Sequence, residues 1–448
     1  MSKVEKAVLD LAKVSDLNAV VSECSLKSEN IENNLLLDMP VVVKDNISTK
    51  GIKTTGSSKF LESYVPVFDA TVVEKLKNSG ATIIAKTSLD ELAMGGFGLT
   101  SATGPVLNPL DNTRVAGGSS AGSAALVAAN VVEVAIGTDT GDSCRIPASY
   151  CGIVGFKPTY GRISRYGVLP FANSLDHVGI FSNNIKNTAV TLEAIAGYDS
   201  QDMTSSKNPV DKYSDYKDVD LGSKKIGVID NVVEAVSNKE IVKAFNSLVN
   251  KLNEHLDTVE HIVFNRQLFK AQNTLYKIIS NAEAVSSHSN LNGLAFGERR
   301  EGLNLEEIMI NSRSKGFGSQ VKARYLIGGY SLDINNIETT FNQAKKVRRL
   351  LVDDINESLE DVDFLMAPAA ARIAPKLDEV NNVDIYSDEH LIANNYMVMD
   401  NYTGNPGIVV PMTKVDGMPV GVYISSRAFS EKDLLAIASL IEEIVGEI

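Results

Sequence analysis

The sequence predicts an α/β fold, in which helices cover both faces of a central β-sheet. Residues 69–94 suggest a helix, a glycine stop and a buried strand, which is the order of a β-α-β crossover. Residues 121–137 repeat that order. The β-branched run at 131–136 has no strict polar alternation, as is typical of a strand buried on both faces.

The N-terminal elements follow in order. Apolar residues at helical spacing predict an amphipathic helix over residues 1–22. The stretch MPVVVKDNI, 39–47, predicts a short strand with Lys44 at its end. After the strand within 69–94, we expect a new helix capped near Ser88.

From about residue 200 a polar connection leads to alternating strand and helix patterns. The predicted elements are a strand at 225–230, helices at 238–256, 266–290 and 335–360, a strand at 363–371, and a C-terminal hairpin followed by a helix. We expect one domain over 1–448, with core motifs at 39–184 and 363–445 and a more helical insertion around 200–345.

Composition narrows the class of protein. A net charge of −13 argues against a free-standing nucleic-acid binder, because affinity for phosphates depends on Lys and Arg. Three cysteines in 448 residues make no disulfide framework and favour a reducing compartment. The sequence has no apolar run long enough to span a membrane and no secretory or transit segment, so we expect a cytoplasmic protein.

The segment 114–143 concentrates the features of an active site. A glycine-serine loop with Ser119 and a second loop with Ser143 enclose a small-residue helix and a strand. A serine at a tight strand-to-helix turn exposes its hydroxyl, while nearby backbone N–H groups face a developing oxyanion. The residues expected to supply this oxyanion hole are Thr140, Gly141 and Asp142.

A serine nucleophile needs a base, and a lysine is the best candidate. The five histidines occur in settings typical of structural or surface positions. Lys44 ends an apolar strand, where desolvation lowers a lysine pKa; neutrality near pH 7 needs a drop of about three units, or about 4 kcal/mol. The alternative nucleophile is Cys144, which follows Ser143 directly. Two other cationic residues are interpreted as structural. Lys86 lies at the end of a predicted strand, and Arg145, two residues after Ser143, is expected to pair with Asp139 or a neighbour.

Three segments together resemble the amidase signature family: VVVKDNI, AGGSSAGSAA (116–125) and GTDTGDSCRIPASYCGIVGFKPTYGRIS (137–164). The resemblance implies an α/β fold with a mixed central sheet and a Ser-Ser-Lys triad. Lys44 matches the family's lysine, Ser119 its bridging serine and Ser143 its acyl-forming nucleophile. It also implies a cis peptide bond between Gly118 and Ser119.

Longer blocks are similar to the branch of this family that acts in tRNA-dependent amidation. They are 157–184, 276–299, 316–332 and the segment from 401 to 435. Members of this branch hydrolyse glutamine and send ammonia to a B subunit, which uses ATP and Mg²⁺ to amidate mischarged glutamyl-tRNA(Gln); the complex also contains a C subunit. The resemblance implies these partners for this chain, no cofactor in the chain itself, and tRNA contact mainly through the partner.

The resemblance also implies a glutamine pocket. Arg324 matches the arginine that holds the substrate carboxylate, a bidentate task suited to guanidinium, and Tyr276 matches a pocket tyrosine. The aspartate that receives the substrate ammonium falls at Asn394, which has no charge. Asp400 is the substitute if the alignment slips.

A second departure from the family lies beside the nucleophile, where Asp142 replaces the glycine of DTGGS. A carboxylate pointing at the oxyanion would repel it, whereas one pointing away would leave the N–H free to act. Two other functions stay open: a free-standing amidase for another small amide, and a catalytically weak scaffold with Asp142 and Asn394 as signs of decay. The sequence does not distinguish glutamyl-tRNA(Gln) from aspartyl-tRNA(Asn) as the acceptor.

Overall fold

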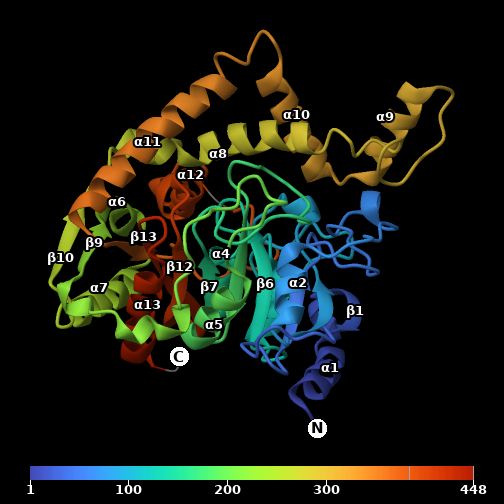
Figure 1. The fold of residues 1–448 in the computed structure, drawn as a ribbon. Coiled ribbons are helices and arrows are strands. Elements are labelled where there is room, and N and C mark those ends of the chain that lie inside the picture. Colours follow the sequence, from blue (N-terminus) through green and yellow to red (C-terminus); the bar gives the residue numbers. More distant parts are fainter. Residues whose placement is uncertain (383, 447–448) are drawn as a thin grey trace.

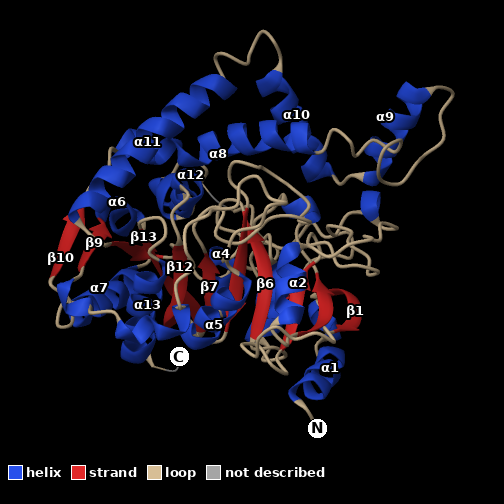
Figure 2. Cartoon of the chain, viewed as in Figure 1, coloured by secondary structure: helices blue, strands red, loops and turns tan. Residues whose placement is uncertain are grey.

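A computed structural model describes residues 1–382 and 384–446 and confirms the α/β fold with a mixed sheet covered on both faces (Figures 1 and 2). Its 11-stranded sheet has the order β1 (Val20–Leu26), β3 (Thr82–Thr87), β2 (Pro40–Lys44), β6 (Val134–Asp139), β8 (His177–Ser182), β7 (Val154–Lys157), β12 (Gly407–Val415), β13 (Met418–Ser426), β11 (Phe364–Pro368), β9 (Lys225–Ile229) and β10 (Thr258–Ile262). A separate two-stranded sheet pairs β4 (Leu107–Asn108) with β5 (Asp111–Val115).

The strands β3, β2 and β6 are parallel neighbours and form the part of the sheet that carries the predicted site. Every residue of these strands is buried, as their continuous apolar patterns predict. Because the three strands run in the same direction, their carboxyl ends meet at one edge of the sheet. That edge is where ligands bind in open α/β sheets.

Helices form layers on the two faces of the sheet. In Figure 1, α2 (Thr71–Asn78), α5 (Ile185–Ile195), α7 (Lys239–Leu252) and α13 (Glu431–Val445) lie in front, and α4 (Arg145–Cys151) lies behind, where it packs on α3 (Ala121–Ala128). The N-terminal helix α1 (Lys3–Lys13) contacts β2 and β3. The short helical elements are α6 (Asp230–Ala235), α12 (Met399–Thr403), η1 (Ser15–Leu17), η2 (Lys59–Leu61), η3 (Glu91–Ala93), η4 (Tyr213–Asp218), η5 (Leu221–Ser223), η6 (Glu389–Ala393) and η7 (Tyr396–Val398).

A further helical layer crosses the molecule above one end of the sheet (Figure 1). It contains α8 (Arg266–Ser287), α10 (Ser319–Leu332) and α11 (Phe341–Asp361), while α9 (Leu305–Gly316) extends to one side. Both α10 and α11 pack on α8. The strands β9 and β10 come from the same region of the chain but extend the main sheet at its edge.

Two predicted helices are wrong in extent. The expected helix over 1–22 ends at Lys13, because Val14 leaves helical backbone angles (φ −114°, ψ 22°). The turn η1 follows and is capped by the left-handed Asn18 (φ 54°), and the alternating residues after it form the edge strand β1. The helix expected near Ser88 is the three-residue turn η3, because Leu92 and Ala93 have positive φ angles. The side chain of Asp90 accepts hydrogen bonds from the backbone of 98–100 and does not cap a helix.

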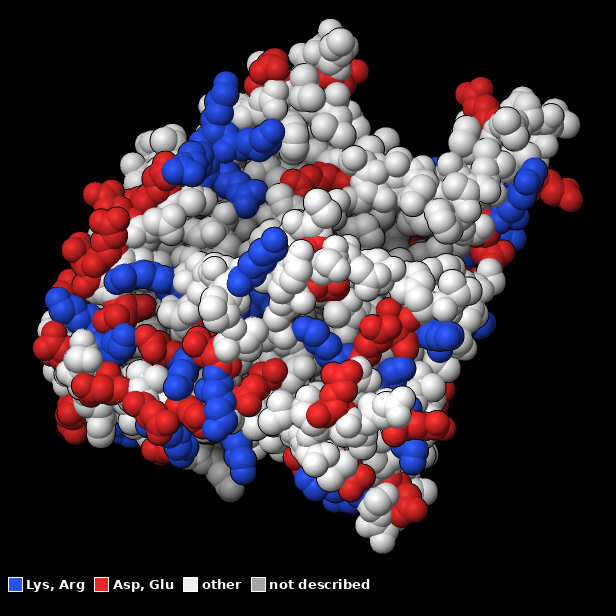
Figure 3. All heavy atoms as spheres, viewed as in Figure 1, with Lys and Arg blue, Asp and Glu red and all other residues white. Residues whose placement is uncertain are grey.

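Within 1–382 and 384–446, no helix combines the length and apolarity needed to cross a bilayer. Figure 3 shows Lys and Arg gathered over the N-terminal half of α11, where Lys345, Lys346 and Arg349 are exposed, and acidic residues toward its other end. The charges of α11 therefore lie mainly on a solvated face.

Candidate active site

Lys44 is the last residue of β2, and its side chain is completely buried. Its Nζ donates hydrogen bonds of 2.8 Å to Ser119 Oγ, 2.8 Å to Ser120 Oγ and 2.8 Å to Thr138 Oγ1. Thr138 lies near the end of the adjacent parallel strand β6, so the shared strand direction brings these groups together. The structure thus joins two of the predicted residues, Lys44 and Ser119, across the sheet.

Burial lowers the pKa of Lys44 to about 8, although the negative charges of Asp90 and Asp139 act in the opposite direction. Desolvation disfavours the ammonium form, and the hydroxyl partners bring no charge to compensate. An amine with this pKa is partly neutral near pH 7. The sequence predicted this direction, with a slightly larger drop.

Ser119 lies in a tight loop whose backbone leaves no room for a side chain at the preceding residue. The Gly118–Ser119 peptide bond is cis, as the family resemblance implied. A Cβ on Gly118 would come within 2.1 Å of Asp90 Oδ2 and 2.8 Å of the backbone N of Phe97. Only glycine fits here, and the close packing fixes Ser119 beside Lys44.

Ser143 lies near the end of the loop 140–144 between β6 and α4 and is 3% exposed. Its carbonyl accepts a hydrogen bond of 3.4 Å from the N–H of Ser120, so the two serine loops are in contact. Among the described residues, the Ser143 hydroxyl has no hydrogen-bond partner, and no hydrogen bond joins it to Ser119 Oγ. The structure therefore places the loop of Ser143 against the loop of Ser119, but the two serine hydroxyls do not form a hydrogen bond with each other.

The loop before Ser143 has unused backbone donors. In the part of the chain that the structure describes, the N–H groups of Gly141, Asp142 and Ser143 donate no hydrogen bond. The backbone N–H of Thr140 likewise donates no hydrogen bond within the described residues, while its hydroxyl donates to Asp176 Oδ1 at 2.7 Å. Free backbone N–H groups next to a serine hydroxyl have the composition of an oxyanion hole.

Arg145 holds this loop in place from behind. Its buried guanidinium donates to Asp139 Oδ1 at 2.9 Å, to Gly141 O at 2.8 Å and to Asp400 Oδ2 at 3.0 Å. The predicted structural role of Arg145 is confirmed, including its pairing with Asp139. The alternative that Asp400 receives a substrate ammonium is wrong, because Asp400 is fully buried in this ion-pair network.

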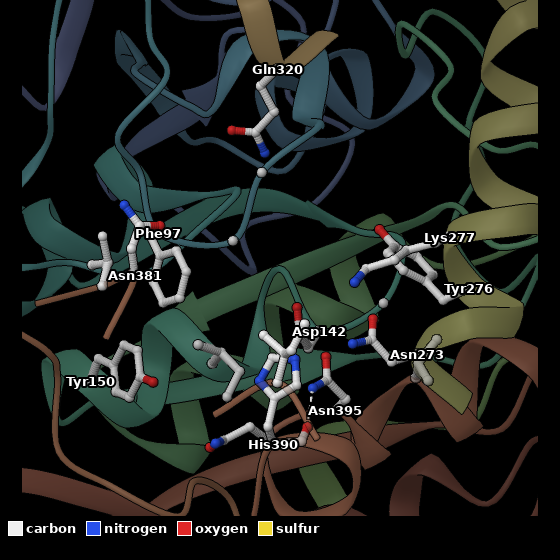
Figure 4. Close-up of a pocket in the computed structure, with 18 of the residues that line it drawn as sticks. Phe97, Asp142, Tyr150, Asn273, Tyr276, Lys277, Gln320, Asn381, His390 and Asn395 are labelled. Carbon is white, nitrogen blue, oxygen red and sulfur yellow. Dashed lines mark hydrogen bonds between the residues drawn. The ribbon is translucent and has the colours of Figure 1, made fainter. Parts of the chain in front are cut away.

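A cavity of about 390 Å³ opens beside the loop and contains all three residues of the predicted glutamine pocket. Tyr276 on α8, Arg324 on α10 and Asn394 after η6 line it together with Gly141 and Asp142. Figure 4 shows the side chains that surround this space. The helical layer of Figure 1 thus supplies one wall of the cavity, and the carboxyl end of β6 supplies another.

Two of these residues have polar groups without protein partners. Arg324 Nη1 and Asn394 Nδ2 are buried and make no hydrogen bond within the described residues. The Arg324 guanidinium lies over the ring of Phe171, at 5.6 Å from its centroid. A cation held over an aromatic ring with a free N–H is ready to bind a carboxylate.

Asp142 faces the cavity, which answers the question that the sequence left open. Burial raises the pKa of Asp142 to about 7, and the negative charge of Asp139 adds to the rise. The carboxyl is therefore partly protonated near neutral pH. Its backbone N–H remains free while its side chain lies in the cavity wall.

The structure also bears on Cys144, the alternative nucleophile, and on Lys86, the second lysine at a strand end. Burial raises the pKa of the Cys144 thiol, so little thiolate is present at neutral pH. Lys86 is confirmed as structural: it is buried, bonds to Ile47 O at 2.8 Å and pairs with Asp45 at 3.3 Å.

Several residues of the site were not predicted. Ser120 and Thr138 accept hydrogen bonds from the Lys44 amine, as Ser119 does. Their positions within the motifs AGGSSAGSAA and GTDTG were the sequence features that could have identified them. The cavity wall also contains Lys277, Arg372 and His390, which no local sequence pattern singles out.

Comparison with known proteins identifies the family. The family described as Amidase matches residues 14–435. A curated relative from Mycoplasma genitalium, named as the A subunit of glutamyl-tRNA(Gln) amidotransferase, is 37% identical and covers 98% of this chain and 93% of its own length. A protein of the same name from Mycoplasma pneumoniae is 39% identical over 93% of this chain and 88% of its own.

Solved structures agree with the sequence comparison. The crystal structure of the A subunit of glutamyl-tRNA(Gln) amidotransferase from Thermotoga maritima has a TM-score of 0.82 at 33% identity and covers 98% of this chain and 91% of that one. A crystal structure titled as an amidase has a TM-score of 0.80 at 26% identity, with 99% and 96% covered. With its matched motifs and full-length similarity, the chain belongs to the amidase family.

Proposed function

We propose that this chain is the glutamine-hydrolysing subunit of a tRNA-dependent amidotransferase, and that it supplies ammonia for the conversion of glutamyl-tRNA(Gln) to glutaminyl-tRNA(Gln). Near full-length similarity to proteins of that name supports the proposal. The observation that carries the chemistry is the buried Lys44 amine bonded to Ser119, next to a serine loop with free N–H groups. The cavity beside them is large enough for an amino acid.

The proposed reaction begins with attack of Ser143 Oγ on the side-chain amide carbon of glutamine. Its proton passes to Ser119 Oγ as the Ser119 proton passes to neutral Lys44 Nζ. The amide oxygen becomes an oxyanion and accepts hydrogen bonds from N–H groups of the loop 140–143. For Ser143 and Ser119 to exchange a proton, their hydroxyls must approach each other when substrate binds.

In the second half, the protonated Lys44 returns its proton through Ser119 to the amide nitrogen. The C–N bond breaks, ammonia leaves, and a glutamyl ester remains on Ser143. Water then attacks the ester carbon and gives its proton through Ser119 to Lys44. The C–O bond to Ser143 breaks as the relay returns this proton to Ser143 Oγ, and glutamate is released. Apart from glutamine and water, each step uses only side chains and backbone groups of this chain, so the proposal assigns it no cofactor.

The partner assignments are part of the same proposal. The B and C subunits of the amidotransferase would complete the complex, with ATP and Mg²⁺ used by the partner for the amidation of tRNA. The net charge of −13 is consistent with tRNA contact mainly through the partner, because binding to phosphates depends on Lys and Arg. We propose a cytoplasmic location for the complex.

Labelling with an electrophilic glutamine analogue, on the chain co-expressed with the B and C subunits, tests the proposal. We expect a covalent adduct on Ser143 by peptide mass spectrometry, and glutamine-dependent ammonia release that Ser143→Ala abolishes. Cys144→Ala is the matched control, because it changes the next residue and should keep both signals. A complex that takes no label and releases no ammonia would support the scaffold alternative; ammonia release from another small amide by the isolated chain would support a free-standing amidase.

A further inference from the structure

The cavity has an unequal charge distribution. Three of its lining residues carry cationic groups, namely Lys277, Arg324 and Arg372. Asp142 is the one acidic residue among the described lining residues. A ligand that has both a carboxylate and an ammonium group can therefore pair its carboxylate with any of three cationic side chains. Its ammonium group can pair only with the carboxylate of Asp142 among the described lining residues.

Asp142 is available for such a contact. Within the described residues, its carboxylate oxygens accept no hydrogen bond, although the residue is half-buried in the cavity wall. Its backbone carbonyl is already used, accepting from the N–H of Arg145 at 2.8 Å and of Ile146 at 2.9 Å, which fixes the main chain. A carboxylate on a fixed backbone with free acceptor oxygens is preorganised for a ligand.

Neighbouring groups do not supply the same function. Asn394 lines the cavity but carries no charge. Asp400 lies behind the loop, where it accepts hydrogen bonds from Arg145, Tyr423 and Ser425 at 2.6 to 3.0 Å. Tyr276 packs close to the loop, since a Cβ on Gly141 would lie 3.1 Å from its ring, and it presents a phenol and no anion.

We propose that Asp142 binds the α-ammonium group of the amino-acid substrate and so makes the site selective for α-amino acid amides over amides without an amino group. This inference rests on the proposed function, which makes glutamine the ligand. The same residue then acts twice: its N–H faces the oxyanion, and its side chain holds the substrate in the cavity.

This assignment gives the aspartate beside the nucleophile a physical reason. An unpaired carboxylate in a half-buried position is unfavourable, and a substrate ammonium supplies the missing counter-charge. The ammonium contact keeps the carboxylate ionised and draws it toward the ligand. It thereby reduces the repulsion that a free carboxylate would exert on the oxyanion.

Calorimetric titration of the chain in its complex, with Ser143→Ala to prevent turnover, tests the inference. The two ligands are L-glutamine and glutaramate, which keeps the carboxylate and amide and lacks the amino group. We expect Asp142→Asn to weaken L-glutamine binding by at least about 30-fold and to change glutaramate binding by less than about threefold. Asp378→Asn is the matched control, because Asp378 is exposed near the cavity residue Val380 and should leave both affinities unchanged.

Equal changes for the two ligands, no change for L-glutamine, or no measurable binding of L-glutamine to the Ser143→Ala protein would overturn the inference. The proposed function is judged separately, by ammonia release from the wild-type complex. Selective loss of L-glutamine binding in a complex that never releases ammonia would leave the ammonium site standing and refute the glutaminase. Ammonia release by the wild-type complex, with equal effects of Asp142→Asn on the two ligands, would support the glutaminase and refute the ammonium site.

Discussion

The strongest prediction concerns the pH dependence of turnover. Burial lowers the pKa of Lys44 from 10.5 to about 8. At pH 7 this leaves about a tenth of the amine neutral, compared with about 0.03% for an exposed lysine, a gain of about 300-fold. Because only the neutral amine accepts a proton, we expect kcat for glutamine hydrolysis to rise about tenfold per pH unit below about pH 8 and to level off above it.

The assay is ammonia release by the assembled complex at saturating L-glutamine, so that kcat reports the enzyme with substrate bound. Lys44→Met should lower kcat by about a thousandfold or more, since it removes the base together with its hydrogen bonds to Ser119, Ser120 and Thr138. Circular dichroism of this variant should match the wild type, because the substitution removes a buried amine and leaves an apolar chain of similar length.

Lys86→Met is the matched control for the loss of a buried lysine on the neighbouring strand. It breaks the ion pair with Asp45 and should cost stability, but its remaining activity should keep the wild-type pH midpoint. A kcat that is flat between about pH 6 and pH 8, or a Lys44→Met variant with activity near wild type, would refute the reasoning.

Three further predictions follow from single residues. Arg145→Met should lower the free energy of unfolding by about 3–5 kcal/mol in urea titrations, because Asp139 and Asp400 lose their shared partner; a loss below about 1 kcal/mol would contradict the buried network. Arg324→Lys should raise KM for L-glutamine at least about tenfold with a smaller effect on kcat, because lysine cannot bind a carboxylate in the bidentate way, and an unchanged KM would remove Arg324 from the pocket. Cys144→Ala should keep kcat within about threefold of wild type, since the thiol is buried with a raised pKa; a loss of about a hundredfold would revive the thiol nucleophile.

Local sequence predicted the parts of the site that lie on regular elements. The apolar run before Lys44 specified a buried strand, and the small residues around Ser119 specified a loop with close backbone contacts. The helix predicted over 1–22 was too long because the backbone angles of Val14 and Asn18, which end α1 and η1, are not revealed by periodicity.

The opposite wall of the cavity was only partly predictable. Tyr276 and Arg324 were found through family motifs, and the structure places both at the cavity. Lys277, Arg372 and His390 reach it from helices and loops far apart in the sequence, through packing that no short pattern encodes. The charge balance around Asp142 therefore became visible only in three dimensions.

The network around Arg145 has a consequence for biosynthesis. Its guanidinium donates to Met397 O and to Asp400, which are 252 and 255 residues further along the chain. A nascent polypeptide that has emerged only as far as β11 already contains both serines and the lysine, yet Arg145 still lacks the two contacts that tie its loop to the segment around residue 400. We therefore expect the glutaminase centre to mature late in translation, after the segment around residue 400 has left the ribosome.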